Sequence, residues 1–295
     1  MRTFFVNFIG LLAVALLAED TLGQPCQKAK DASRIAVAGG SITEIIYFLG
    51  EQSRIIAVDR TSNFPPEAGE TPSVGYVRNL SSEGLLSLKP TLVLGENDMG
   101  PEEVLTQLRA TSVETRKVNE KHTSQGIVEK IRCVSSILGV PKKADEAIGR
   151  TLEPLLSELS RIRRESKESK IKVALFLMFN QGMPMVAGID TSGDGVLKMA
   201  GLHNAFPELE GWKPVSLESM AAANPDAIVI TQRGVDMAGG IEAVKAHASV
   251  RLTKAAKNNL ILAVDGMSLL GFGPRTLTTA IQLSDQLLNS GDKKG

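Results

Sequence analysis

The chain contains only two tyrosines, and one of them lies in the segment Gly75-Tyr76-Val77-Arg78. A tyrosine hydroxyl ordinarily titrates near pH ~10 and is a poor metal ligand while it keeps its proton. Ferric iron favours the phenolate, and a cation two residues away, Arg78, favours it further. Tyrosine is also one of the few side chains that hold haem iron axially. The segment therefore indicates a candidate iron ligand, with an ordinary packed tyrosine as the alternative.

The elements around Tyr76 predict a loop on an α/β scaffold. Pro72 and Gly75 favour a loop before a helix near residues 82–88. The run RIAVA predicts a strand, and a capping-box spacing predicts a helix from about Ser41 to Leu49. The β-rich runs IIAV and TLVL follow, with helical patterns near residues 82–88, 101–109 and 124–138. Strands that alternate with helices are typical of a lobe built on a parallel sheet.

A second lobe is expected beyond a long helix. Residues 142–170 are rich in Glu, Arg, Leu and Ser with helical periodicity, and a helix of about 28 residues would extend roughly 42 Å. The alternation then resumes with KVALFLMF, DAIVIT and LILAV. We expect two Rossmann-like lobes with mainly parallel sheets and a ligand cleft between them. Residues 24–141 would form the first lobe, 142–170 a linker helix and 171–295 the second lobe.

An internal repeat supports the division into two lobes. LSSEGLLSLKPTLVL, which begins at Leu80, aligns without gaps with VSLESMAAANPDAIV, which begins at Val215. The alignment matches Glu83 with Glu218, and each carboxylate falls where it favours the dipole of a predicted helix. The same helix, turn and strand are therefore predicted twice, and clefts between such lobes are common ligand sites.

The N-terminal segment, the net charge and the two cysteines restrict the class of protein. Residues 1–23 show the pattern of a cleaved signal peptide, because about 15 apolar residues interrupted by Asn7 are too few to span a bilayer. We therefore expect an exported chain whose mature form does not span a membrane. The 33 basic and 33 acidic side chains cancel, so no nucleic-acid partner is expected. Cys26 lacks the small preceding residue of a lipidated cysteine, and its pairing with Cys133 is left open.

Four segments together resemble a known family: GGSITEIIYFLG, TPSVGYVRNLSSEGLLSLKPTLVL, MVAGIDTSGDGVLKMAGLHNA and LLGFGPRT. They are similar to the haem-specific branch of the periplasmic substrate-binding proteins of bacterial ABC importers, within the helical-linker class that also serves siderophores and cobalamin. In that family the tyrosine of G-Y-x-R binds haem iron, and the matching residue here is Tyr76, with Arg78 beside it. One surface glutamate on each lobe docks with the permease, and Glu83 and Glu218 match that pattern.

The resemblance implies a periplasmic, monomeric binding protein and not an enzyme. Its transported ligand would be ferric protoporphyrin IX, received from a donor at the outer membrane and passed to a haem ABC permease. We expect two arginines to hold haem propionates. They are Arg233, in the loop after the strand AIVIT, and Arg275, in the segment GFGPRT. Met178, Met183 and Met185 are expected to contact the macrocycle, because methionine side chains adapt to flat apolar ligands. The loop after Phe179 reads Asn180-Gln181-Gly182, so a second-lobe histidine ligand found in some family members is not expected.

Two alternatives remain at the level of sequence. The same scaffold would also carry a ferric siderophore or a corrinoid, and Tyr76 would then not need to touch metal. The other alternative is an enzyme that modifies haem in the cleft. It is disfavoured because the chain lacks a dinucleotide fingerprint, a P-loop and a nucleophile-elbow motif.

Overall fold

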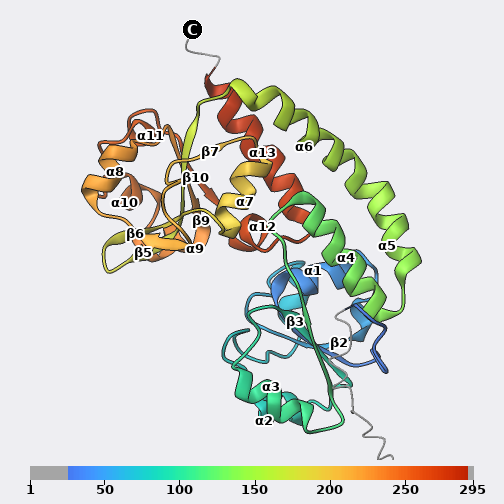
Figure 1. Ribbon diagram of the computed structural model, residues 1–295. Coiled ribbons are helices and arrows are strands. Elements are labelled where there is room, and N and C mark those ends of the chain that lie inside the picture. Colours follow the sequence, from blue (N-terminus) through green and yellow to red (C-terminus); the bar gives the residue numbers. More distant parts are fainter. Residues whose placement is uncertain (1–25, 292–295) are drawn as a thin grey trace, which may run out of the picture.

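The computed structural model describes residues 26–291, so the predicted signal peptide lies outside the described residues. The described chain forms an upper and a lower α/β lobe, with a long helical stretch along one side of both (Figure 1). Within residues 26–291, none of the helices has the length and apolar character that a membrane span requires.

The first lobe is a four-stranded parallel sheet in the order β2-β1-β3-β4. Its first three strands are short, mostly apolar runs such as IAVA, whose four residues are all buried, whereas β4 is ETRKV and only its last residue is buried. Burial on both faces is the reason that these runs show no polar alternation. The elements are β1 (Ile35–Ala38), α1 (Gly40–Phe48), η1 (Gln52–Arg54), β2 (Ile55–Val58), η2 (Pro66–Glu70), α2 (Ser82–Ser87), β3 (Leu92–Glu96), α3 (Glu102–Arg109), β4 (Glu114–Val118) and α4 (Ser124–Leu138).

The first helix begins without the capping box that the sequence suggested. The N-cap residue is Gly39, and no side chain caps the helix. Ser41 instead donates its hydroxyl to Glu96 at the end of β3, and Glu44 accepts hydrogen bonds from Arg275 of the second lobe. The prediction of a capping box was therefore wrong, because both side chains make contacts with distant parts of the chain.

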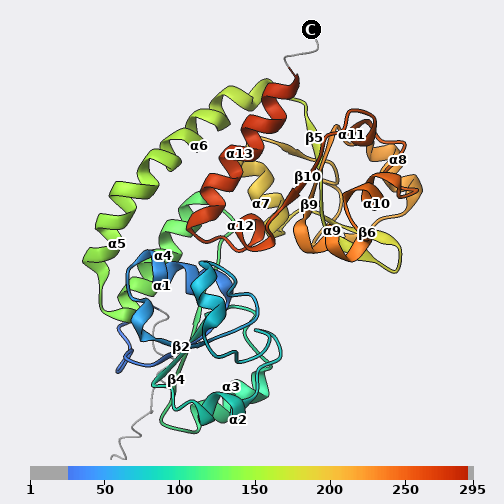
Figure 2. The ribbon, with the colours of Figure 1, turned by 180° about the vertical axis from the view of Figure 1, so that it is seen from behind.

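A helical stretch connects the two sheets, and it runs from the first lobe to the far end of the second in both views (Figures 1 and 2). Its hydrogen bonding loosens to the π pattern just before Pro154, which has no N–H to donate. The stretch consists of α5 (Pro141–Ala147), η3 (Ile148–Leu152), α6 (Glu153–Glu165) and η4 (Ser166–Glu168).

The second lobe holds a mixed sheet in the order β10-β9-β5-β6-β8, with β7 paired to β5. The pairs β5–β9, β9–β10 and β5–β7 are parallel, and β5–β6 and β6–β8 are antiparallel. Two lobes with mainly parallel sheets confirm the predicted fold class. The elements are β5 (Lys172–Asn180), β6 (Met183–Ala187), α7 (Ser192–Met199), β7 (His203–Asn204), β8 (Trp212–Pro214), α8 (Leu217–Ala223), β9 (Ala227–Thr231), α9 (Gln232–Ala238), α10 (Ile241–Ala246), α11 (Lys254–Lys257), β10 (Ile261–Val264), α12 (Gly266–Leu270) and α13 (Pro274–Gly291).

The sequence repeat corresponds to the same structural unit in each lobe. Ser81 caps α2 by accepting from the Gly84 N–H at 3.2 Å, and Ser216 caps α8 by accepting from the Ser219 N–H at 3.2 Å. Each helix leads through a proline turn into an interior parallel strand, β3 in the first lobe and β9 in the second. The units therefore place α2 and α8 in equivalent positions of the two sheets.

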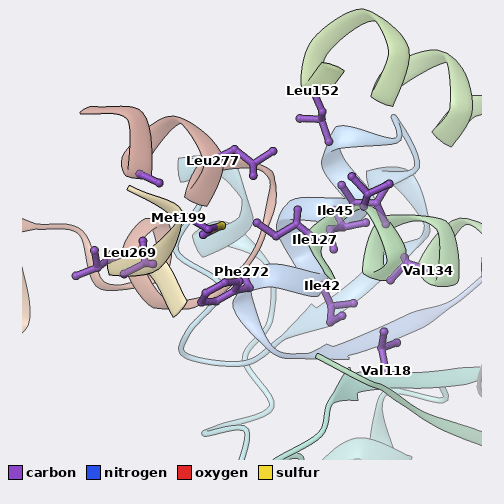
Figure 3. Close-up of a cluster of buried hydrophobic side chains, with 14 of the residues drawn as sticks. Ile42, Ile45, Val118, Ile127, Val134, Leu152, Met199, Leu269, Phe272 and Leu277 are labelled. Carbon is purple, nitrogen blue, oxygen red and sulfur yellow. The ribbon is translucent and has the colours of Figure 1, made fainter. Parts of the chain in front are cut away.

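One hydrophobic core continues from the first lobe into the second (Figure 3). Ile42 of α1 and Ile127 of α4 belong to the same buried cluster as Leu269, Phe272 and Leu277 of the second lobe. Helix α13 packs against α6 and also against α1. Because interiors of this density deform little, the shared core fixes the lobes to each other on the side of α4 and α13.

The two cysteines form a disulfide, which the sequence alone left undecided. Cys26 joins Cys133 of α4 across a sequence separation of 107 residues. The bond fastens the first described residues to the helix at the lobe junction. It also occupies the Cys26 sulfur, which a lipid anchor at this residue would need.

Reduction of the disulfide should lower the free energy of unfolding by about 4 to 5 kcal/mol, because a loop this long restricts the unfolded chain. Guanidinium denaturation with and without dithiothreitol measures the difference. The double variant Cys26→Ser/Cys133→Ser is the control and should be insensitive to dithiothreitol. Equal midpoints for oxidised and reduced wild type would contradict this expectation.

Candidate functional site

The carboxyl ends of the two sheets face each other across the lobe junction. Glu44 lies on α1, the helix directly after β1, and Asp265 directly follows β10. Arg275 joins them, since its Nε donates to Glu44 at 2.9 Å and its Nη1 donates to Asp265 at 3.2 Å. Ligands of open α/β sheets bind at the carboxyl ends of the strands. The loops that leave these two edges are therefore the candidate site.

Tyr76 lies on a loop attached to the carboxyl end of β2. The Val74 N–H donates to the carbonyl of Val58, the last residue of β2, at 2.8 Å. Gly75 adopts φ 90°, a left-handed value that a glycine accommodates without strain, and the Asn79 N–H closes the next turn on the Tyr76 carbonyl at 2.7 Å. The Tyr76 residue is 37% exposed. An ordered backbone thus presents an accessible phenol.

Arg78 contacts the Tyr76 hydroxyl directly. Its Nη1 donates to the Tyr76 Oη at 3.1 Å, while its Nε and Nη2 each lie 2.7 Å from Asp98 Oδ2. Partial burial lowers the pKa of Arg78, but Asp98, Tyr76 and Glu96 together raise it by more, so the pKa lies above its ordinary value and the guanidinium stays charged. The hydrogen bond from Arg78 to the phenol is therefore present in the protein without ligand. Asp98 was not singled out from the sequence. Its place just after a predicted strand was the available signal, but its contact with Arg78 was not.

The three predicted methionines lie on the β5–β6 hairpin. Met178 pairs with Met185, and Asn180 pairs with Met183 beside the turn. Directly paired residues and those two positions along share one face of a sheet, so the three methionine side chains are on the same face. All three are at least partly exposed, and Met183 is 38% exposed. The hairpin therefore presents an apolar, deformable surface.

The two predicted second-lobe arginines have different surroundings. Arg233 is exposed on the first turn of α9, and Met237, one turn later on the same side, is 57% exposed. Arg275 is engaged by Glu44 and Asp265, and its guanidinium carbon lies 3.7 Å from the centre of the Phe64 ring. A propionate role for Arg275 remains a prediction, and it would need the buried Nη2, which has no partner among the described residues.

A buried ionic cluster lies next to this junction. Lys130 of α4 is fully buried and contacts Glu120, the Ser41 hydroxyl at 2.6 Å and the Gly271 carbonyl of the second lobe at 3.1 Å. Burial raises the pKa of Glu96 from 4.5 to about 7, although Lys130 opposes the shift. Burial by itself would raise the pKa of Glu120. Hydrogen bonds and charge from His122 and Lys130 outweigh burial, so the pKa of Glu120 lies below its ordinary value.

Glu83 and Glu218 lie far from the junction. Both are exposed in the first turns of α2 and α8, and these helices lie at the outer ends of the two lobes, on the side opposite α5 and α6, in both ribbon views (Figures 1 and 2). Hydrogen bonds from its own N–H and from Ser216 hold the pKa of Glu218 below its ordinary value, so this carboxylate is charged at neutral pH.

The histidines are used in local contacts. His203 bonds the Ser169 carbonyl at 2.7 Å, His247 bonds Ser249 at 2.8 Å, and His122 lies 3.3 Å from Glu120. Among residues 26–291, no group of three or more His, Cys, Asp or Glu is arranged to hold a metal ion.

The fold and the facing edges define a two-lobed α/β binding protein of the type that serves transporters. The chain belongs to the periplasmic binding protein family, whose model matches residues 35–266. An ABC transporter substrate-binding lipoprotein of Bacillus subtilis is 26% identical over 271 residues, which are 91% of this chain and 84% of the relative.

Two further relatives differ in the ligand that their names give. A vitamin B12-binding protein of Pectobacterium carotovorum is 26% identical over 190 residues, 64% of this chain and 67% of that protein. The structure of a periplasmic heme-binding protein from Roseiflexus sp. RS-1 is similar with a TM-score of 0.80 and 31% identity, over 88% of this chain and 99% of that one.

The raised pKa of the partly buried Glu96 gives a signed pH dependence. Because the pKa of Glu96 is raised in the folded protein, Glu96 destabilises the fold increasingly as pH rises from 4.5 to about 7. Glu96→Gln should therefore gain stability relative to wild type, by on the order of 1 kcal/mol or more, between pH ~5 and pH ~8. Urea denaturation at both pH values measures this gain, with the exposed Glu103→Gln as the control. A difference between variant and wild type that is independent of pH would contradict the assignment.

Proposed function

We propose that this chain is an extracytoplasmic binding protein that captures ferric haem between its lobes and delivers it to an ABC permease. One observation carries the proposal: an exposed phenol, Tyr76, with a guanidinium on its hydroxyl, stands on a loop at the carboxyl edge of the first sheet. The family supports transport and not catalysis, since its members are substrate-binding proteins.

The chemistry of the proposed contact follows from Arg78. The Arg78 guanidinium donates to the Tyr76 oxygen and would stabilise the negative charge that this oxygen carries when it binds ferric iron. In this proposal Tyr76 is the axial ligand and Arg78 stabilises its charge. The Met178, Met183 and Met185 surface contacts the porphyrin, and the exposed Arg233 binds a propionate, with Arg275 a second candidate for that role.

A corrinoid or ferric siderophore is the alternative cargo, and the vitamin B12-binding relative favours it. That relative is 26% identical over 64% of this chain, whereas the heme-binding structure is 31% identical over 88%. In addition, a cobalamin brings its own cobalt ligands and gives no reason for an arginine on the Tyr76 hydroxyl. The geometry at Tyr76 therefore favours haem.

Delivery would use the outer ends of the lobes. Glu83 and Glu218 occupy equivalent turns of the repeated unit, so a permease with two similar halves would meet the same charge on each lobe. We further propose that the protein is a monomer in the periplasm and that it receives haem from an outer-membrane donor. The signal peptide that this location requires is the segment predicted at residues 1–23.

Replacement of Tyr76 by alanine should abolish the charge-transfer band of phenolate-bound ferric haem and weaken haemin binding by on the order of 100-fold, since the ligand itself is lost. Visible absorption during haemin titration measures both effects. Tyr47→Phe, which removes the only other phenol, is the matched control and should leave the spectrum unchanged. An unchanged spectrum in Tyr76→Ala would refute the haem assignment, and tight binding of cyanocobalamin would support the alternative.

Loss of either docking carboxylate should slow delivery without affecting haem binding. Glu83→Ala and Glu218→Ala should each weaken the complex with the permease by roughly fivefold, because each variant removes one exposed ion pair. Haem uptake into proteoliposomes that contain the permease measures the effect. Glu103→Ala and Glu242→Ala remove exposed carboxylates from first turns of other helices and serve as controls. Uptake that falls equally in the controls would argue against specific docking.

A further inference from the structure

The Arg78 side chain is held at the Tyr76 phenol by a third residue, Asp98. Arg78 is 62% exposed, and an exposed arginine samples many rotamers unless it is bonded. Its Nε and Nη2 both lie 2.7 Å from one oxygen of Asp98. This double contact orients the planar guanidinium and leaves Nη1 to donate to the Tyr76 hydroxyl at 3.1 Å.

The position of Asp98 is itself fixed relative to the Tyr76 loop. Asp98 lies two residues after the end of β3, which is an interior strand of the first sheet. The Gly100 N–H donates to the Val77 carbonyl at 2.9 Å, and the Leu80 N–H donates to the Gly100 carbonyl at 2.9 Å. These two hydrogen bonds join the loop that carries Asp98 to the loop that carries the phenol. The backbone therefore holds the two loops that carry the carboxylate and the hydroxyl in a fixed relation to each other.

We propose that Asp98 is a positioning residue for haem capture, which fixes the Arg78 guanidinium on the phenolate oxygen of Tyr76. This role rests on the proposed function and extends it by one residue. Without the carboxylate, the guanidinium spends most of its time in solvent and the phenolate loses its partner. Asp98 does not contact the haem iron and acts only through Arg78.

Two substitutions separate positioning from charge. Asp98→Ala and Asp98→Asn remove the same negative charge, but the asparagine keeps an oxygen that can accept both arginine hydrogen bonds. A difference between them therefore reports the orientation of Arg78. Glu102→Ala is the matched control, because it breaks the ion pairs of Glu102 with Arg109 and Lys117 on the same lobe and removes no contact of Arg78.

The first measurement needs no haem. In the 15N-labelled protein without ligand, the heteronuclear NOE of the Arg78 Nε–H, identified by its absence in Arg78→Lys, reports the mobility of the side chain. We expect a rigid signal in wild type, Asp98→Asn and Glu102→Ala and a mobile one in Asp98→Ala. Equal rigidity in Asp98→Ala and Asp98→Asn would overturn the proposal.

The second measurement is the rate at which the loaded protein loses haem to excess apomyoglobin. Asp98→Ala should release haem about tenfold faster than wild type, Asp98→Asn should stay close to wild type, and Asp98→Ala should add nothing in an Arg78→Leu background. Equal rates for the alanine and asparagine variants, or an additive effect without Arg78, would overturn it. A wild type that binds no haemin refutes the proposed function, whereas the NOE still decides whether Asp98 positions Arg78.

Discussion

The proposed ligand capture depends on the fixed face-to-face placement of two sheet edges. The shared core around Ile127 and Phe272 and the contacts of Lys130 and Arg275 hold the lobes together on one side. A buried ion pair of this kind costs desolvation, so its value lies in geometry more than in stability. The long helical stretch from α5 to α6 adds a second rigid connection. A binding protein built in this way is expected to admit its ligand with small movements between the lobes.

Within that frame, the chemistry is concentrated in one loop of the first lobe. Tyr76 is accessible on a loop that is attached to the carboxyl end of β2. The backbone of this loop is ordered because hydrogen bonds connect it to the loop after β3. The second lobe offers a different kind of surface, with a methionine face on the β5–β6 hairpin and Arg233 on α9. In the proposed function, one lobe would supply a hard oxygen ligand, and the other would supply apolar contact and charge. This division suits a flat ligand with iron at its centre and carboxylates at its rim.

Much of this arrangement follows from local sequence patterns. The repeat located α2, β3, α8 and β9 because a capping serine, a turn proline and an apolar run act within a few residues. The loop character of Tyr76 followed from Gly75 in the same way. The pattern failed at Ser41 and Glu44, where a good capping-box spacing is overridden by contacts with residues far along the chain. The long-range partners could not be obtained from spacing: Arg275 pairs with a residue 231 positions away, and Cys26 with one 107 positions away. Asp98 is intermediate, since its place at the end of a predicted strand was available but its orientation toward Arg78 was not.

The most direct test of haem capture by Tyr76 is a crystal structure of the haem-loaded protein with anomalous diffraction collected at the iron edge. We predict an iron peak within coordination distance of the Tyr76 Oη, with Arg78 bonded to the same oxygen and the lobes oriented as in the free protein. An iron position ligated by another residue, or a tyrosine hydroxyl that points away from the metal, would contradict it.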